Sequence, residues 1–163
     1  RDAFRADHIG YIFQMFNLIP YLSLIENVTL PCRFSTKRRQ RALSQASTIE
    51  EEAKRILSAL KLDLTTTISQ PVSQLSIGQQ QRVAAARSII GSPELIIADE
   101  PTGNLDPQTS NEIMEVFKKL HKQGIAVFMA THDYNMIVKF PGKIFKCDSG
   151  KVFEVIAKQN KKK

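Results

Sequence analysis

The chain has 163 residues, of which 42% are hydrophobic and 24% are charged, a balance typical of an ordinary globular protein. Its two cysteines, Cys32 and Cys147, follow no metal-ligand spacing, which favours partly buried free thiols in a reducing compartment. No apolar run approaches the roughly twenty residues that cross a bilayer. Composition therefore argues against a disulfide-held scaffold and against a protein that anchors itself in a membrane.

The formal net charge of +7 makes an anionic partner one option. The positive charge gathers in two groups, one near residue 40 and one in the tail: Lys37, Arg38, Arg39 and Arg41, then Lys158, Lys161, Lys162 and Lys163. No aromatic side chains interleave with either group, so we expect no nucleic-acid partner. The first group is either a solvated helix start or a surface that meets lipid headgroups.

The hydrophobic pattern alternates between short strand-like runs and helical stripes, which predicts a parallel sheet wrapped by helices. Residues 8–13 are expected to form the first strand. Ser23 and Glu26 have the spacing of a capping box, which begins a short helix, and this helix should end before Pro31.

A second capping box, Ser47 with Glu50, should begin a longer helix. The predicted apolar face of that helix consists of Ile49, Ala53, Ile56, Leu57 and Leu60. Residues 22–74 are therefore expected to be mainly helical.

Helices and strands alternate again in the second half of the chain. Residues 79–90 are predicted to be helical, and residues 94–98 to form an apolar strand that is buried on both faces. Asp106 and Pro107 supply the N-cap and the first-turn proline of the next helix. The last predicted elements are a second buried strand and a hairpin, over residues 125–130, 144–147 and 151–155.

Two adjacent carboxylates, Asp99 and Glu100, follow the strand at residues 94–98. Parallel sheets carry their functional groups at the carboxyl ends of strands, so this pair should face a crevice. Asp99 can supply an oxygen ligand to Mg²⁺ beside phosphates, and Glu100 can polarise an attacking water. Taken alone, the same pair also fits a strand that runs into an acidic loop.

Residues 75–82, with the sequence Leu-Ser-Ile-Gly-Gln-Gln-Gln-Arg, form a second candidate site. Ser76 precedes a predicted helix and Gln79 follows three residues later, so unpaired N–H groups, a hydroxyl and the helix dipole face one point. This arrangement favours an anion, although a simple capped helix has the same pattern.

Two further polar residues follow predicted strands. His132 can hydrogen-bond a terminal phosphate and the attacking water. Gln14 can coordinate a metal ion or orient water. Each of them, taken alone, is more typical of a structural histidine or an ordinary polar residue at a strand end.

Five segments in this order resemble the motifs of the ATP-binding cassette (ABC) family: Gln14, residues 75–82, Asp99 with Glu100, residues 104–106, and His132. The resemblance extends over residues 9–153. It implies an α/β fold, namely the P-loop NTPase (RecA-like) core of an ABC ATPase, with a parallel sheet plus an α-helical subdomain.

The resemblance also implies how a single, partial nucleotide-binding domain over residues 1–163 would be divided. Residues 8–20 would be the Q-loop region, and residues 22–74 a mainly helical subdomain. Residues 75–155 would contain the signature, Walker B, the D-loop, the switch region and the C-terminal hairpin. Residues 156–163 would be a basic tail.

The resemblance assigns a role to each motif residue. Asp99 would serve Mg²⁺, with Gln14 as a further metal ligand, and Glu100 would be the general base. His132 and Gln14 would sense the γ-phosphate. The ATP held by the opposite subunit would be bound by Ser76, Gly78 and Gln79, and Ile77 and Asp106 would also belong to the cofactor-binding residues. ATP and Mg²⁺ are thus the implied cofactors, and a head-to-tail dimer with a second ATPase subunit is the implied assembly.

The segment around Gln14 and residues 98–106 are similar to one branch of the family, which contains the lipoprotein-releasing and macrolide-export ATPases. Such subunits drive transport from the cytoplasmic, inner face of the cell membrane. They are held there by the transmembrane subunit of a permease, whose coupling helix docks between the Q-loop and the helical insert. The resemblance therefore implies peripheral attachment through a partner.

Two features depart from the family pattern. Ile77 stands where the commonest signature has glycine, which places a β-branched residue where the backbone must approach phosphate. No Gly-x-x-x-x-Gly-Lys-Ser/Thr string occurs in the sequence. We therefore expect an incomplete copy of the cassette that lacks the N-terminal P-loop and β-subdomain portion. By itself it should bind ATP poorly and hydrolyse little or none.

Two other functions stay open at this point. One is a non-catalytic interaction module that binds a permease or a complete ATPase subunit through the helical insert and the signature face. The other is a soluble ABC ATPase of translation or DNA repair, although such proteins usually carry paired cassettes or a coiled-coil insertion.

Overall fold

A computed structural model describes residues 1–68, 70–103 and 105–155 of the chain. They form two compact units, residues 1–131 and the residues from 132 onward, and each unit is described by itself. Asn104 and the basic tail at residues 156–163 lie outside the described residues.

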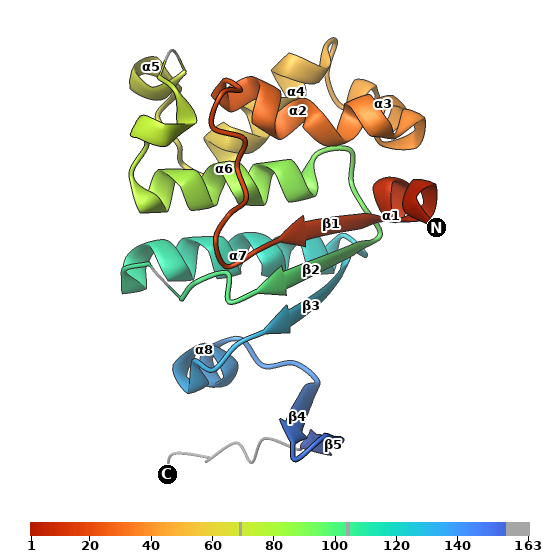
Figure 1. Ribbon diagram of the computed structural model, residues 1–163, viewed down its shortest axis with the longest axis vertical. Helices are drawn as coiled ribbons and strands as arrows, with labels where there is room; N and C mark the ends of the chain where they lie inside the picture. The colour runs from red at the N-terminus through yellow and green to blue at the C-terminus, as the bar shows by residue number, and fades with distance from the viewer. Residues whose placement is uncertain (69, 104, 156–163) are drawn as a thin grey trace. The chain divides into compact units, whose positions relative to one another are not determined.

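Three parallel strands form the sheet of the first unit: β1 (Ile9–Ile12), β2 (Leu95–Asp99) and β3 (Ala126–Ala130), in the order β1-β2-β3. Gly10 pairs with Ile96, and Ile96 with Val127. The prediction of a parallel sheet is confirmed, and the three strands point the same way in Figure 1.

Helix α6 (Ile77–Ile89) packs directly on the sheet. The approach is closest at Gly10, where a Cβ atom would lie 2.2 Å from the carbonyl oxygen of Ser88, so any larger residue would push the helix away. Ile12, Ile96 and Ala98 lie on the same face of the sheet by the two-residue alternation of strands, and all three are buried.

Strand β3 is less buried than predicted. Phe128 is 57% exposed, and Ala126 and Ala130 are exposed as well. Among the described residues β3 pairs only with β2, so it is an edge strand, and Phe128 lies on the opposite face from Ile96. The apolar run predicted a strand correctly, but whether both faces are covered depends on neighbouring elements and not on the run itself.

Of the described residues between β1 and α6, most form four α-helices: α2 (Leu24–Phe34), α3 (Thr36–Leu43), α4 (Ile49–Ala59) and α5 (Leu64–Thr67). Helices α2 and α4 pack on α6, which therefore lies between them and the sheet, as Figure 1 shows. A 3₁₀ turn, η1 (Val72–Gln74), leads into α6.

Two predicted helix boundaries are wrong. Helix α2 does not end before Pro31 but contains it. The proline removes one backbone hydrogen bond, yet Val28 and Cys32 on either side of it are buried, and their packing outweighs this loss. The second capping box is formed one residue later than expected, by Thr48 with Glu51, because these side chains are the ones that reach each other's backbone N–H groups.

The basic group near residue 40 is not uniformly solvated. Arg38 is 2% exposed, whereas its neighbour Arg39 is exposed. Its guanidinium donates hydrogen bonds to the backbone carbonyl oxygens of Ile90 and Ser88 at 2.8 and 2.7 Å. Arg38 therefore fixes α3 to the end of α6, a structural role that is neither a solvated helix start nor a contact with lipid headgroups.

Two further helices complete the description of the first unit. Helix α7 (Pro107–Lys122) begins with the predicted proline and packs on β3 and α6. It ends before Gly124, whose positive φ of 94° is typical of the residue after a helix. The sequence pattern did not predict helix α1 (Asp2–His8), which precedes β1. This helix includes His8, the residue at which the first strand was expected to begin.

The second unit contains helix α8 (Tyr134–Lys139) and an antiparallel hairpin of β4 (Ile144–Asp148) and β5 (Lys151–Val155). The hairpin is confirmed, and Ser149 and Gly150 both have positive φ, as a two-residue turn of this hand requires. Cys147 in β4 is exposed, contrary to the expectation of partial burial, whereas Cys32 is buried.

Candidate functional site

The carboxyl ends of the three strands lie at one edge of the sheet. Ile12 pairs with Ala98 and Asp99 pairs with Ala130, so the residues that follow these positions emerge side by side. This register brings Asp99 and Glu100 to the same edge as Thr131.

The backbone of Glu100 adopts a conformation that is unusual for this residue type. Its φ is +44°, in the left-handed region. The N–H of Glu100 donates to the carbonyl oxygen of Ala130 at 3.0 Å, and its own carbonyl oxygen accepts from Gly103 at 3.2 Å. Thr131 donates its hydroxyl proton to Oε2 of Glu100 at 3.3 Å, a contact that the sequence pattern did not indicate. The chain turn and this hydroxyl together set the direction of the carboxylate.

Asp99 is exposed, and within the described part of the chain its carboxylate takes part in no hydrogen bond or ion pair. Its oxygens are therefore available to a ligand. The described residues contain no group of three or more His, Cys, Asp or Glu side chains that could hold a metal ion by themselves. One free carboxylate suits Mg²⁺ that arrives with phosphate and water ligands, and it does not suit a metal caged by protein alone.

The segment at residues 75–82 leads into α6 and forms its first six residues. Ser76 is the N-cap, its hydroxyl accepts from the N–H of Gln79 at 3.3 Å, and the Gln79 side chain accepts from the N–H of Ser76 at 2.8 Å. This capping box leaves the N–H groups of Ile77 and Gly78 without helical partners, because they belong to the first turn. The side chain of Ile77 is 56% exposed. The turn therefore presents backbone donors and an apolar side chain to the surface.

Gln81 connects this turn with the segment after β2. Its side chain is 1% exposed, and its Nε2 donates to the carbonyl oxygen of Pro101, the residue after Glu100. A Cβ atom added at Gly78 would lie at ordinary van der Waals distance, 3.7 Å, from Thr109 of α7. Gln81 thus ties the start of α6 to the segment that follows β2. The sequence pattern assigned no role to Gln81, because only the tertiary structure shows what a buried amide contacts.

Asp106 is the N-cap of α7. Its Oδ1 accepts from the N–H groups of Gln108 and Thr109 at 2.9 and 3.0 Å. Hydrogen bonds from the Thr109 side chain and backbone hold the pKa of the Asp106 carboxyl below its ordinary value. The carboxylate that the family resemblance placed beside nucleotide is therefore already engaged in capping.

The remaining two predicted site residues are exposed. Gln14 lies two residues beyond the end of β1, at the strand edge described above. His132 follows Thr131 in the chain and is the first residue of the second unit, so the structure leaves its role untested.

The loop after Gln14 is held at two points. Phe16 and Asn17 both have positive φ, +62° and +47°. The guanidinium of Arg87, on α6, donates to the carbonyl oxygens of Phe16 and Asn17, both at 2.6 Å. Further on, the buried Asn27 of α2 accepts from the N–H of Ile19 at 2.8 Å and donates back to its carbonyl oxygen at 3.0 Å.

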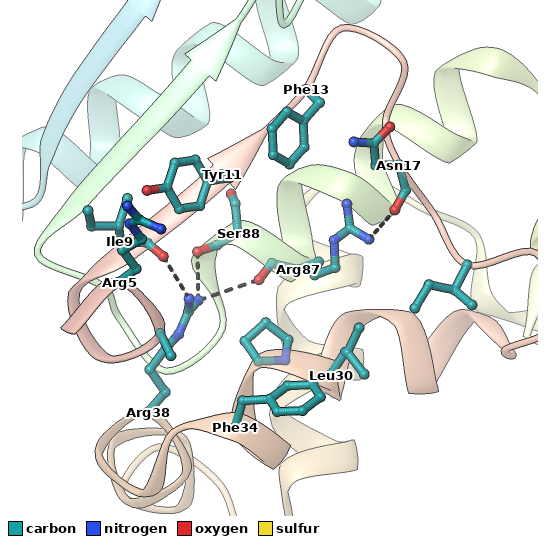
Figure 2. A pocket seen from close by; sticks show the side chains of 13 residues that line it. Arg5, Ile9, Tyr11, Phe13, Asn17, Leu30, Phe34, Arg38, Arg87 and Ser88 are labelled. Atoms are coloured by element: carbon teal, nitrogen blue, oxygen red, sulfur yellow. Dashed lines mark hydrogen bonds between the residues drawn. The ribbon is translucent and has the colours of Figure 1, made fainter. Parts of the chain in front are cut away.

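A pocket of about 430 Å³ lies between β1 and α2. Figure 2 shows Tyr11 and Phe13 along the strand side and Leu30 and Phe34 on the helix side, with Arg87 pointing toward Asn17. Phe34 is 75% exposed. An exposed apolar wall of this kind is typical of a surface that receives another chain.

In the part of the chain that the structure describes, no helix is both long enough and apolar enough to cross a membrane.

Comparison with protein families finds that residues 1–103 match the model of the ABC transporter family. The uncharacterised ABC transporter ATP-binding protein MJ0796 of Methanocaldococcus jannaschii is 43% identical over 151 residues, which are 91% of this chain and 61% of that protein. The chain therefore spans less than two thirds of this relative's length.

Two further relatives belong to transport systems by name. The lipoprotein-releasing system ATP-binding protein LolD of Neorickettsia sennetsu is 43% identical over 83% of this chain and 57% of its own length. The macrolide export ATP-binding/permease protein MacB of Pasteurella multocida is 40% identical over 79% of this chain and 18% of its own length.

A dimeric structure of MJ0796 in a post-hydrolysis state, bound to ADP and Pi, superposes on this chain with a TM-score of 0.75 at 36% identity. The match covers 94% of this chain and 65% of that one. The α/β fold of an ABC ATPase cassette is thereby confirmed.

Proposed function

The chain belongs to the ABC transporter family, and from this premise we propose that it is an ATP-binding subunit that couples ATP binding and hydrolysis to transport by a membrane permease. The observation that carries the proposal is the strand edge with Asp99 and Glu100, to which Gln81 ties the first turn of α6. Unpaired backbone donors of α6 and the unpaired carboxylate of Asp99 face solvent there, as a site for Mg²⁺ and phosphate requires.

An Mg²⁺ ion held at this edge would supply positive charge beside the phosphate groups. Asp99, exposed and without a described partner, is the residue proposed to hold it, with Gln14 as a further ligand. Glu100 is proposed to accept a proton from the attacking water, since its positive φ and the hydroxyl of Thr131 fix the direction of its carboxylate. His132 and Gln14 are proposed to sense the terminal phosphate.

The first turn of α6 is proposed to bind the ATP of a second subunit. It lies at the surface, and its backbone donors suit an anion that another chain holds. The proposed contacts come from Ser76, Ile77, Gly78 and Gln79, with Asp106 at the neighbouring helix start. This assignment leads to a head-to-tail dimer, which the dimeric MJ0796 structure supports by analogy.

The pocket between β1 and α2 is proposed to receive the permease. It adjoins the loop after Gln14, and the exposed Phe34 gives it an apolar wall. The subunit would then be held peripherally at the cytoplasmic face of the membrane through its partner. We propose no nucleic-acid partner and retain the subdivision of residues 8–20, 22–74 and 75–155 into the Q-loop region, the helical subdomain and the signature-to-hairpin part.

The 163 residues contain no P-loop string, so we expect this chain alone to bind Mg²⁺·ATP weakly. The test is calorimetry on the chain and on a chimaera in which the part of MJ0796 before its matched region is fused ahead of residue 1. Tight binding and ATP turnover are expected in the chimaera only. Glu100→Gln should abolish that turnover, whereas Glu115→Gln on the surface of α7 should not.

The competing function is a non-catalytic module that binds a permease or a complete ATPase subunit. The pocket between β1 and α2 favours it, because docking through the exposed Phe34 needs this surface and no bound nucleotide. A chimaera that folds but neither binds nor hydrolyses ATP would decide for this function and against an ATPase.

A further inference from the structure

Every charged residue that lines the pocket between β1 and α2 is positive. Its charged lining residues are Arg5, Arg38 and Arg87, and no acidic residue of the described chain lines it. Arg38 is occupied by backbone carbonyl groups, and Arg5 pairs at 3.1 Å with Asp2, which does not line the pocket. Within the described residues no carboxylate forms an ion pair with Arg87. Arg38 is buried, whereas Arg87 is partly exposed, so Arg87 is the accessible arginine of this pocket for which the described chain supplies no acidic partner.

Arg87 holds a strained segment. Its two hydrogen bonds go to the carbonyl oxygens of Phe16 and Asn17, consecutive residues that are both in the left-handed conformation. Non-glycine residues adopt that conformation only at an energetic cost, so the segment needs an external hold. Burial lowers the pKa of Arg87, because removal from water disfavours the charged form and the carbonyl groups offer only partial negative charge in return.

We propose that the permease segment in this pocket places an apolar side chain between Phe13 and Phe34 and a carboxylate against Arg87, and that this carboxylate competes with the carbonyl oxygens of Phe16 and Asn17. The inference rests on the proposed function, since it takes the pocket as the permease-docking site. A carboxylate matches the planar guanidinium with two oxygens and a full charge, so it binds more strongly than two separate carbonyl groups.

The consequence concerns Gln14. When the carboxylate binds Arg87, Phe16 and Asn17 lose their hydrogen bonds from the Arg87 guanidinium and relax from the left-handed conformation. Because Gln14 precedes them by only two residues, occupancy of the pocket changes the loop that carries this proposed phosphate-sensing side chain. Arg87 is therefore a positioning residue, and the docked partner regulates it.

The test uses the 163-residue chain and a small probe, 3-phenylpropionate, with the neutral 3-phenylpropanamide as its isostere. Binding is followed through backbone amide resonances by NMR titration. We expect the acid to bind about tenfold more tightly than the amide, with the largest shifts at residues 16–18. Equal affinity of the two compounds, or shifts confined to other parts of the pocket, would overturn the inference.

Hydrogen exchange separates competition from simple binding. The N–H groups of Phe16 and Asn17 donate to the carbonyl oxygens of Phe13 and Met15 at 2.9 and 2.7 Å, and their exchange should accelerate with the acid but not with the amide. Unchanged exchange at saturation with the acid would show that the loop is not released, which contradicts the competition.

Arg87→Met should remove the preference for the acid, and Arg5→Met, which changes the other accessible arginine of the pocket, should preserve it. If the Arg87→Met variant does not fold, Arg87→Lys is used instead. Lysine retains the positive charge but lacks the planar pair of guanidinium donors, so it should lower the preference for the acid over the amide severalfold. Nucleotide binding by the chimaera is measured independently. If the chimaera binds ATP and the probe shows no preference, this inference alone is wrong; if the chimaera fails while the preference holds, the ATPase function is wrong.

Discussion

The guanidinium of Arg38 donates two hydrogen bonds to the carbonyl oxygen of Ile90, from Nε at 2.8 Å and from Nη2 at 2.5 Å. Ile90 is the C-cap residue of α6, so this contact satisfies a carbonyl group that the helix itself leaves open. Burial lowers the pKa of Arg38 to about 10, because its partners are neutral carbonyl groups and no described carboxylate balances its charge. The arginine fastens the helical insert to the sheet-bearing core.

Arg38→Met should lower the free energy of unfolding by roughly 2–4 kcal/mol, because it leaves several buried carbonyl groups without donors. Urea unfolding followed by far-ultraviolet circular dichroism measures the change. The matched control is Arg39→Met, one residue along the same helix and exposed, which should stay within about 0.5 kcal/mol of the parent. Equal effects of the two substitutions would show that the carbonyl contacts of Arg38 contribute nothing specific.

Gly91→Ala should destabilise the chain more than Gly124→Ala. Both glycines have positive φ, +68° and +94°, so both substitutions cost backbone strain of about 1 kcal/mol. At Gly91 the new Cβ would also meet backbone, 2.4 Å from the carbonyl oxygen of Arg38, whereas no atom of the described residues lies within 4 Å at Gly124. We expect the difference between the two to exceed about 1 kcal/mol in urea unfolding. A difference near zero would mean that α3 moves away freely.

Glu100→Gly should raise the free energy of unfolding by about 0.5–1 kcal/mol, because glycine adopts the left-handed conformation of this position without strain. Glu100→Gln keeps the strain and should leave stability unchanged. Thermal unfolding of the two variants and the parent provides the comparison. A stability gain with glutamine instead would locate the cost in the carboxylate rather than in the backbone, and would contradict the strain interpretation.

Stability should fall with pH in the acid range partly through Asp106. The folded pKa of this carboxyl lies below its ordinary value of 3.8, so its capping contribution is present above that value and is lost as the pH falls through the folded pKa. Asp106→Asn keeps an N-cap acceptor that does not titrate. The variant should therefore lose less thermal stability than the parent as the pH falls from 3.8 through the folded pKa of Asp106. Parallel losses in both proteins would contradict this assignment.

Local features of this chain were readable from sequence because they depend on neighbours a few residues apart. The capping boxes at Ser23 and Ser76 and the proline start of α7 all involve contacts within a single helical turn. The hairpin turn at Ser149 and Gly150 is equally local. The order of the motifs along the chain also sufficed to indicate the family, and the matching family model confirmed it.

Other features depended on contacts between distant segments. Arg38 has the sequence context of a solvated helix start. It is buried only because the end of α6 lies nearby, where Arg38 hydrogen-bonds the carbonyl oxygen of Ile90. Phe128 belongs to a run that looks like core, yet the coverage of β3 leaves it exposed. Pro31 should end a helix locally, but packing around it prevails. Periodicity encodes which residues can share a face, whereas burial and hydrogen-bond partners arise only when that face meets another segment.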